Sequence, residues 1–193
     1  MQKHFYAMMS RMKNIYRWGL MRNTRQENLS EHSLEVAQIA HALARINRNR
    51  FAGNADPNFV AVSAMYHDTS EIITGDLPTP VKYYNDDIRK AYQQIEAISE
   101  QSLLSMLPDD LKEEYVPLIS SEHSDKELVP YVKAADKLSA LIKCICEIRM
   151  GNREFIKAER TIRESLESTD LVALKVFMEE FLPAYDLTLD ELD

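Results

Sequence analysis

The chain has 193 residues, of which 45% are hydrophobic and 28% charged, with only four glycines and seven prolines. This composition is ordinary for a soluble globular protein, fits one domain with a sizeable core, and leaves little room for linkers or a turn-rich β fold. The net charge of −8 speaks against a nucleic-acid polymer as partner, because such binding needs a basic face. A small anionic substrate is still allowed, since a metal ion and one or two arginines can set the local field.

The first twenty residues, MQKHFYAMMSRMKNIYRWGL, carry charge throughout and contain no long apolar run. We therefore expect neither a signal peptide nor a membrane span, no membrane partner, and a cytoplasmic protein. Cys144 and Cys146 lie two residues apart in a helical stretch, so their side chains point in different directions. We expect both to be reduced and unpaired.

Apolar periodicity predicts helices throughout and no strand, which is an all-α fold. A first helix is expected near residues 4–16 and a loop over 17–29. The next helix, near 30–46, is expected to begin at Ser30, a residue type that caps helix N-termini. His32 leads the apolar stripe of this helix, which continues with Val36, Ile39, Leu43 and Ile46.

A helix is expected over residues 57–74, because Asp56 can cap it and Pro57 suits its first turn. Gly75 fits the position that ends this helix. The following segment, Asp76-Leu77-Pro78-Thr79-Pro80, is expected to be a stiff loop, because two prolines two residues apart break helix and strand alike.

The second half of the chain is also predicted to be helical. A helix near residues 86–106 is expected to carry an apolar stripe of Ile88, Tyr92, Ile95 and Ile98. No repeat, low-complexity tract or domain boundary is visible, so residues 1–193 are expected to form a single compact helical bundle. The remaining helices are predicted near 109–116 (ending at Pro117), 126–150, 153–167 and 169–182.

Four side chains in the predicted helices form a pattern typical of a metal site: His32, the pair His67-Asp68, and Asp136. Neighbouring residues on a helix diverge by about 100°, so the pair can hold one ion off the helix face only with ligands from other helices. His32 and Asp136 lie on or beside apolar stripes and so point inward, where an isolated carboxylate is costly. Singly, such residues are usually a hydrogen-bonded core histidine and a solvated aspartate.

The joint pattern favours a metal site between the helices near 30–46, 57–74 and 126–150. Imidazole nitrogen and carboxylate oxygen suit Mn²⁺, Co²⁺, Fe²⁺ or Zn²⁺. Because such a set leaves positions for water and substrate, it indicates hydrolytic chemistry.

Three flanking features could complete this chemistry. Glu71, one turn after His67, could act as a general base or give a proton to a leaving oxygen; by spacing alone an exposed helix glutamate is equally good. Arg17 could bind phosphate through a bidentate fork, and Trp18, the only tryptophan, could shape a pocket wall, although a surface arginine beside a core tryptophan is the simpler interpretation. The loop over 76–80 suits a pocket rim or a plain connector.

Three segments resemble a known family, the HD-domain metal-dependent phosphohydrolases, and within it the bacterial 5′-deoxynucleotidases of the YfbR type. They are RWGLMRNTRQENLSEHSLEVA (17–37), AMYHDTSEIITGDLPTPVKYYN (64–85) and KAADKLSALIKC (133–144). The resemblance covers nearly the whole chain, with departures in its C-terminal third.

The resemblance implies an all-helical, homodimeric, metal-dependent enzyme that removes the 5′-phosphate from deoxyribonucleoside 5′-monophosphates and discriminates against ribonucleotides. It implies one divalent transition metal, Co²⁺ or Mn²⁺ first, with Zn²⁺, Cu²⁺ or Fe²⁺ as alternatives. Glu71 would be the catalytic acid or base, Arg17 would bind the phosphate and Trp18 would orient the substrate. The metal ligands would be His32, His67, Asp68 and Asp136. Further substrate contacts would come from His32, Asp68, Asp136, Asp76, Leu77, Pro78 and Thr79.

Two other interpretations keep a metal. The first is an HD-type hydrolase of another nucleotide, such as a dNTP, a ppGpp-like compound or a cyclic dinucleotide. The small, acidic chain speaks against a triphosphate substrate, Ile72 after Glu71 departs from the HDxxED motif of ppGpp hydrolases, and no GYP motif is present. The second is a non-catalytic helical binding module with a structural metal, which would leave Glu71 and Arg17 without a role.

Overall fold

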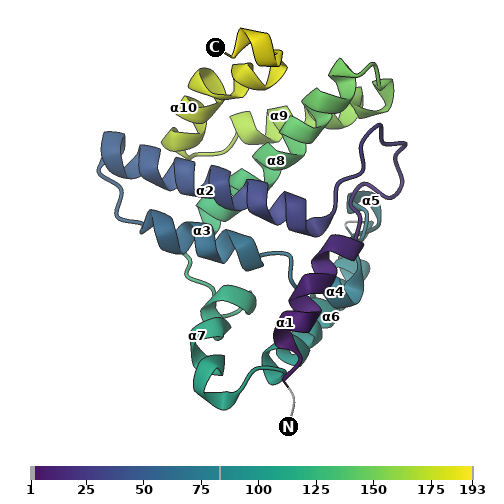
Figure 1. Cartoon of the computed structure of the whole chain (residues 1–193), viewed down its shortest axis with the longest axis vertical. Helices are drawn as coiled ribbons and strands as arrows, with labels where there is room; N and C mark the ends of the chain where they lie inside the picture. The colour runs from purple at the N-terminus through teal and green to yellow at the C-terminus, as the bar shows by residue number, and fades with distance from the viewer. Residues whose placement is uncertain (1–2, 83, 193) are drawn as a thin grey trace.

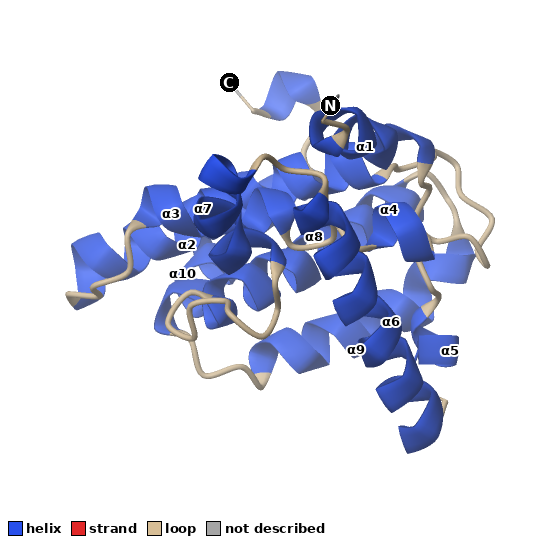
Figure 2. Ribbon diagram, turned by 90° about the horizontal axis from the view of Figure 1, so that it is seen from below, coloured by secondary structure: helices blue, strands red, loops and turns tan. Residues whose placement is uncertain are grey.

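The long helix α2 (Leu29–Phe51) runs through the middle of the molecule and packs against the helices on either side of it (Figure 1). The computed structural model describes residues 3–82 and 84–192; the ends of the predicted domain, residues 1 and 193, and residue 83 of the 64–85 segment lie outside this range. Within these ranges the chain is helical apart from loops and one isolated bridge between Tyr16 and Asn28 (Figure 2). The all-α prediction is therefore confirmed.

The N-terminal end of α2 is capped by Asn28 and not by the predicted Ser30. The side chain of Asn28 accepts hydrogen bonds from the backbone N–H groups of Ser30 and Glu31, and the Glu31 carboxylate accepts one from the Asn28 N–H. This reciprocal capping box satisfies donors that a helix leaves free. The prediction that Ser30 caps the helix is wrong by two residues.

The predicted helix over 57–74 is two helices, α3 (Pro57–Tyr66) and α4 (Glu71–Thr74). The predicted start is confirmed, since the Asp56 side chain accepts from the Asn58 N–H and Pro57 lies in the first turn. The helix breaks over residues 67–70. There His67 Nδ1 lies 2.7 Å from the Ala64 carbonyl oxygen and Thr69 Oγ1 donates to the Tyr66 carbonyl, so side chains occupy carbonyls at the end of α3.

Gly75 ends α4 with φ of +73°, as predicted, a backbone conformation that favours glycine. The loop after it is shorter than predicted. The short helix α5 (Thr79–Lys82) includes Pro80, because a proline in the first turn needs no N–H partner.

A smaller layer lies beside the main bundle (Figure 1). It consists of the N-terminal α-helix, the 3₁₀ helix that follows it, and helices α6 and α7. The predicted first helix is α1 (Phe5–Met9) followed by a 3₁₀ helix (Ser10–Asn14). Helix α6 (Asp86–Ser105) has almost the predicted bounds. Helix α7 (Asp109–Ile119) continues through Pro117 instead of ending there. This layer has its own small core, formed by Phe5, Leu103, Leu104, Leu107 and Ile119.

The C-terminal third completes the main bundle. Helix α8 (Val129–Arg149) starts three residues later than predicted, because residues 125–128 form a turn before Pro130. Helix α9 (Ile156–Glu167) follows a 3₁₀ helix (Arg153–Phe155), and α10 (Val172–Glu180) is shorter than predicted. Two 3₁₀ helices follow α10, at Leu182–Asp186 and Leu189–Glu191.

The main core lies between α2, α3, α8 and α10. Every member of the stripe predicted for α2 is buried, including His32 at its leading end. Cys144 and Cys146 are unpaired, as predicted. Among the described residues, no helix combines the length and the apolar character that a membrane crossing needs.

Candidate metal centre

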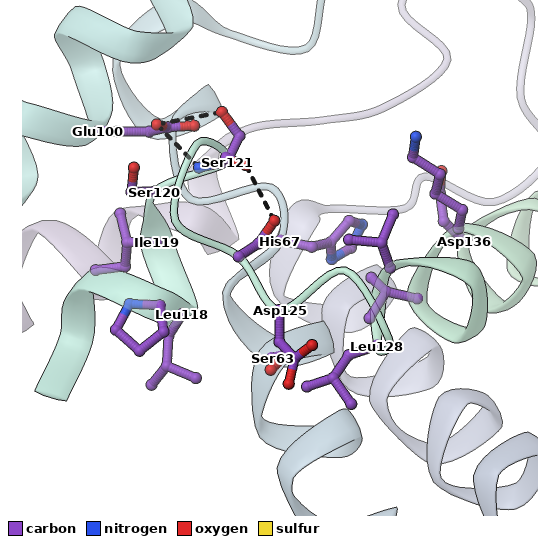
Figure 3. Close-up of a pocket in the computed structure, with 15 residues that line it drawn as sticks. Ser63, His67, Glu100, Leu118, Ile119, Ser120, Ser121, Asp125, Leu128 and Asp136 are labelled. Atoms are coloured by element: carbon purple, nitrogen blue, oxygen red, sulfur yellow. Dashed lines mark hydrogen bonds between the residues drawn. The ribbon is translucent and has the colours of Figure 1, made fainter. Parts of the chain in front are cut away.

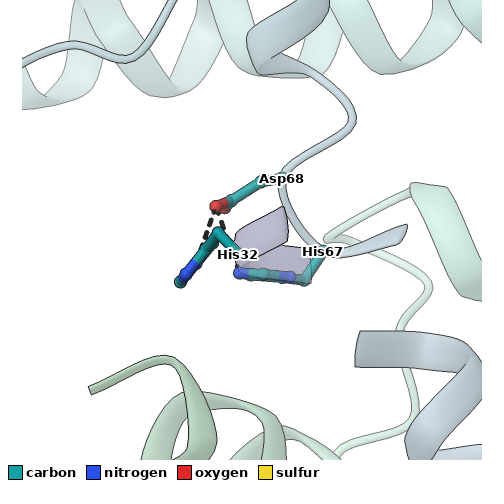
Figure 4. A group of neighbouring side chains, drawn as sticks. All are labelled: His32, His67 and Asp68. Atoms are coloured by element: carbon teal, nitrogen blue, oxygen red, sulfur yellow. Dashed lines mark ion pairs between the residues drawn. The ribbon is translucent and has the colours of Figure 1, made fainter. Parts of the chain in front are cut away.

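The predicted ligands meet where the start of α2, the end of α3 and the start of α8 come together. His32 lies in the first turns of α2, His67 and Asp68 in the turn after α3, and Asp136 in the second turn of α8. The break after α3 matters here, because outside a regular helix two adjacent residues can face the same point. One ligand atom each from His32, His67 and Asp68 lie within 4.8 Å of one another (Figure 4).

Asp68 and Asp136 bring carboxylate oxygens to the imidazole nitrogens. Asp68 Oδ2 lies 3.1 Å from His67 Nε2 and 3.5 Å from His32 Nε2. Asp136 reaches the same group from α8, and its Oδ1 lies 3.2 Å from His32 Nε2. The structure thus brings together all four side chains that the sequence singled out, from segments far apart in the chain.

These side chains fit a divalent cation better than they fit one another. The Nε2 atoms of His32 and His67 are buried, yet neither makes a hydrogen bond of acceptable geometry among the described residues. An unpaired buried polar atom costs free energy, which argues against two hydrogen-bonded core histidines. Two imidazole nitrogens and two carboxylates are a donor set that divalent transition metals accept.

A proton on His67 offsets part of the negative charge of the Asp68 and Asp136 carboxylates. Burial alone would lower the pKa of His67, but the carboxylates of Asp68 and Asp136 raise it to about 9. Burial would raise the pKa of Asp68, yet the two imidazoles hold it well below its usual range. A positively charged imidazolium thus stands where a cation would be stabilised. Because a metal ligand must lose its proton, metal binding here has to release one.

Glu71, the first residue of α4, is buried beside this group rather than exposed. Its Oε2 has no hydrogen-bond partner among the described residues. Burial, and then the nearby carboxylates of Asp68 and Asp76, raise the pKa of Glu71 to about 9. The interpretation of Glu71 as a solvated helix glutamate is therefore wrong. A carboxyl group that holds its proton at neutral pH can donate it.

Arg17 is half-buried, with 14% of its side chain exposed, which overturns its interpretation as a surface residue. Its Nη1 lies 3.3 Å from Glu27 Oε2 and in contact with His32 Nδ1, and its Nη2 lies 3.7 Å from Asp136 Oδ1. The guanidinium therefore stands at the edge of the ligand group, where it can attract an anion.

Trp18 is held by both of its N–H groups. The indole Nε1 donates to Glu27 Oε2 at 3.0 Å, and the backbone N donates to Asp76 Oδ2 at 3.2 Å. Its φ of +62° is a left-handed conformation that is strained for a bulky residue and that often marks a functional site. Asp76 thus joins the 17–28 loop to the segment after α4, whereas Leu77 and Pro78 are half-buried and Thr79 is exposed.

Sequence reasoning missed Glu27, whose carboxylate accepts hydrogen bonds from both Arg17 and Trp18. It also missed Ser139 and Glu35, which lie behind His32. Ser139 lies one turn after Asp136, and Glu35 one turn after His32. That i, i+3 spacing is a signal that could have drawn attention to them.

A cavity of about 340 Å³ borders the group at His67 and Asp136 (Figure 3). It is lined by α3, by the end of α7 and by the segment that leads into α8. Trp18 and residues 76–79 lie outside its lining, so the ligand group has open space on a side that the sequence did not indicate.

In this all-helical bundle a histidine, a His-Asp pair and a distant aspartate meet at one point. That combination defines the class of HD-domain phosphohydrolases. Solved structures agree on the fold. An HD-domain phosphohydrolase from Listeria innocua matches with a TM-score of 0.82 at 24% identity, over 94% of this chain and 88% of that one. The HD phosphohydrolase of cyanophage S-2L, solved with dA and one catalytic Zn²⁺ ion, matches with a TM-score of 0.69 at 18% identity, over 97% and 100%.

Closer relatives narrow the class. The family described as 5′-deoxynucleotidase YfbR-like matches residues 4–185. The 5′-deoxynucleotidase of Erwinia tasmaniensis is 50% identical over 98% of this chain and 96% of its own length. That of Vibrio atlanticus is 48% identical over 99% and 98%. The chain belongs to the YfbR-like 5′-deoxynucleotidase family.

Proposed function

We propose that this enzyme hydrolyses deoxyribonucleoside 5′-monophosphates to the deoxynucleoside and phosphate, with selection against ribonucleotides. The observation that carries the proposal is the convergence of two unpaired imidazole nitrogens and two carboxylates beside a half-buried arginine and a buried glutamate. The pKa of that glutamate is raised to about 9. The names of the full-length relatives, with 48–50% identity, support this choice of substrate.

His32, His67, Asp68 and Asp136 are the proposed ligands of one divalent transition metal, within one domain that spans residues 1–193. Co²⁺ or Mn²⁺ is our first choice, and Zn²⁺, which the cyanophage relative holds, Cu²⁺ and Fe²⁺ are alternatives. When bound, such an ion polarises a phosphate oxygen and lowers the pKa of a water molecule.

The surrounding side chains have distinct proposed roles. Arg17, with its planar fork of donors, holds the phosphate and offsets the charge on its oxygens. Trp18 and residues Asp76, Leu77, Pro78 and Thr79 orient the nucleoside, and His32, Asp68 and Asp136 border the phosphate. A water oxygen bonds to phosphorus and the bond from phosphorus to the 5′-oxygen breaks. Glu71 gives its proton to that oxygen and is reprotonated by the proton that the water loses, so that deoxynucleoside and hydrogen phosphate leave.

We also propose that the enzyme is a cytoplasmic homodimer. Ile95 and Ile98 of α6 are exposed, which supports the idea that a second copy covers this part of the surface. Equilibrium sedimentation tests the oligomeric state directly, because a dimer has twice the 22.3 kDa mass of one chain.

A phosphate-release screen of all ribo- and deoxyribonucleoside monophosphates against a panel of divalent metals tests the function. We expect turnover of the deoxyribonucleotides, little turnover of the ribonucleotides, and none after chelation. Equal turnover of both sets would remove the selectivity. Release of pyrophosphate or tripolyphosphate from other nucleotides would favour another HD-type hydrolase, and tight metal binding without any turnover would favour a structural metal.

A further inference from the structure

The imidazole of His32 has a second nitrogen, Nδ1, and both Ser139 and Arg17 contact that atom. Nδ1 lies 3.0 Å from the hydroxyl oxygen of Ser139, and that hydroxyl donates to Glu35 Oε2 at 2.5 Å. His32 and Ser139 are completely buried. The three side chains form a chain of hydrogen bonds that leads away from the ligand group into the core.

The directions of these hydrogen bonds follow from the number of protons. The Ser139 hydroxyl has a single proton, which it gives to the Glu35 carboxylate. Its oxygen can then only accept from His32, so Nδ1 must carry the imidazole proton. A neutral imidazole with its proton on Nδ1 has a free lone pair on Nε2, the atom that faces Asp68 and Asp136.

Arg17 favours the opposite tautomer. Its Nη1 also contacts His32 Nδ1, and a guanidinium can only donate. If Nδ1 accepted from Arg17, a neutral His32 would carry its proton on Nε2 and could not bind a cation there. Ser139 and Arg17 thus compete for the same nitrogen, with opposite consequences for Nε2.

Helix geometry places the chain of hydrogen bonds. Helix α2 carries His32 and, one turn later, Glu35; helix α8 carries Asp136 and, one turn later, Ser139. Residues three apart share a helix face. Each helix therefore contributes one proposed ligand, His32 or Asp136. One turn later, on the same face, it contributes one supporting polar residue, Glu35 or Ser139.

We propose that Ser139, held by Glu35, is a positioning residue that fixes the tautomer and the ring orientation of His32 for metal binding. The inference rests on the proposed role of His32 as a ligand. Partners behind a ligating histidine commonly change metal affinity by about 10- to 100-fold. A proton on Nδ1 leaves the Arg17 guanidinium without an acceptor at that nitrogen, so the guanidinium is available to the phosphate.

The test is the dissociation constant of Mn²⁺ for the 193-residue protein without substrate, measured by calorimetry. We expect Ser139→Ala to weaken Mn²⁺ binding by about 10- to 100-fold, and Glu35→Ala to weaken it in the same direction. Glu35→Gln keeps an acceptor oxygen and should stay closer to wild type. Because Ser139 and Glu35 act in series, the double alanine variant should be no weaker than Ser139→Ala alone.

Ser33→Ala is the matched control, because Ser33 is a buried serine next to His32 whose hydroxyl has no hydrogen-bond partner among the described residues. A loss in Ser139→Ala no larger than that in Ser33→Ala, or additive losses in the double variant, overturns the inference. His32→Ala distinguishes the proposed metal site from the positioning role of Ser139. If His32→Ala binds Mn²⁺ like wild type, the proposed metal site is wrong. If His32→Ala loses Mn²⁺ binding and Ser139→Ala does not, only the positioning role is wrong. Circular dichroism confirms that each variant is folded.

Discussion

Glu71 occupies a position that stabilises its protonated form at the expense of its charged form. Its pKa, raised to about 9 by burial and by Asp68 and Asp76, lies above the usual value for a glutamate of about 4.3. A raised carboxyl pKa contributes stability below its unfolded-state value and loses it as the pH rises toward the folded-state value. At neutral pH the unfolded chain gains free energy by ionising Glu71 and the folded protein does not, so this residue lowers the free energy of unfolding there.

We therefore expect Glu71→Gln, which mimics the protonated group, to have opposite effects on activity and stability. Phosphate release should fall by at least about 100-fold, while the thermal midpoint of the metal-free protein at pH 8 should rise. At pH 4, where Glu71 is protonated in the folded state and mostly protonated in the unfolded state, the difference between the two proteins should nearly vanish. Wild-type activity should fall as the pH rises through the pKa of Glu71; a fall toward acid pH instead would indicate a base.

Glu27 joins the two residues proposed to handle the substrate, because its Oε2 accepts from Arg17 and from the Trp18 indole. We expect Glu27→Ala to change the fluorescence of Trp18, the only tryptophan in the chain, and to lower activity. Glu27→Gln keeps an acceptor oxygen and should restore most of the signal. Glu31→Ala, which alters the cap of α2 instead, is the control. Unchanged emission in Glu27→Ala would contradict the predicted role.

At the residue scale, the sequence predicted what spacing and chemical type can show. The four proposed ligands stand out because imidazoles and carboxylates lie on or beside apolar stripes. The partial burial of Arg17 and the burial of Glu71 could not be predicted, because both depend on contacts between segments that are far apart in the chain. The carboxylate of Glu27 was hidden for the same reason, since its partners are defined by loop geometry rather than by periodicity.

At the scale of elements, helices were predicted well and their interruptions poorly. The break between α3 and α4 has no proline or glycine to mark it; it comes from side-chain contacts with the carbonyls of α3. Helix α6 has the predicted bounds, but Tyr92 is the only member of its predicted stripe that is buried. The buried face instead includes Ser99, Leu103 and Leu104, because α6 packs on short neighbours that its own sequence does not reveal.

The 17–28 loop is tied to α8 by one buried carboxylate. Glu147 accepts hydrogen bonds from the backbone and hydroxyl of Thr24 at 2.9 and 2.7 Å, from Asn152 at 2.8 Å, and from Lys143. Burial would raise the pKa of Glu147, but the Lys143 ammonium and these donors lower it to about 2. A depressed pKa contributes stability above the unfolded-state value, which is lost as the pH falls toward 2.

We expect Glu147→Gln to lower the free energy of unfolding at pH 7 by about 3 kcal/mol, because it leaves Lys143 buried without its ion-pair partner. Urea titrations should show the difference shrinking between about pH 4.5 and pH 2, the window set by the shift. Glu154→Gln, which breaks an exposed pair with Arg22 at the same loop, should have a small effect. Equal effects of the two variants would contradict the anchoring role of Glu147.

At the scale of the whole molecule, the proposed site lies where three helices of the main bundle, far apart in the sequence, pack against one another. His32, the 67–68 turn and Asp136 belong to three separate segments, and the turn also leads into α4 and the smaller layer around α6. A cation held by all three would therefore oppose global unfolding and not only local fraying. Ligands that bind only the folded state stabilise it by mass action.

We therefore expect Mn²⁺, added to chelator-treated protein, to raise the thermal midpoint. At 100 times the dissociation constant the gain is about 2.7 kcal/mol, which corresponds to about 5–10 °C for a chain of this length. Because binding must displace the proton of His67, whose pKa is about 9, the gain should grow as the pH rises from about 6 toward 9. His67→Ala should abolish it, whereas His41→Ala, a histidine elsewhere on α2, should retain it. An equal shift in both variants would mean that Mn²⁺ binds outside the proposed ligand group.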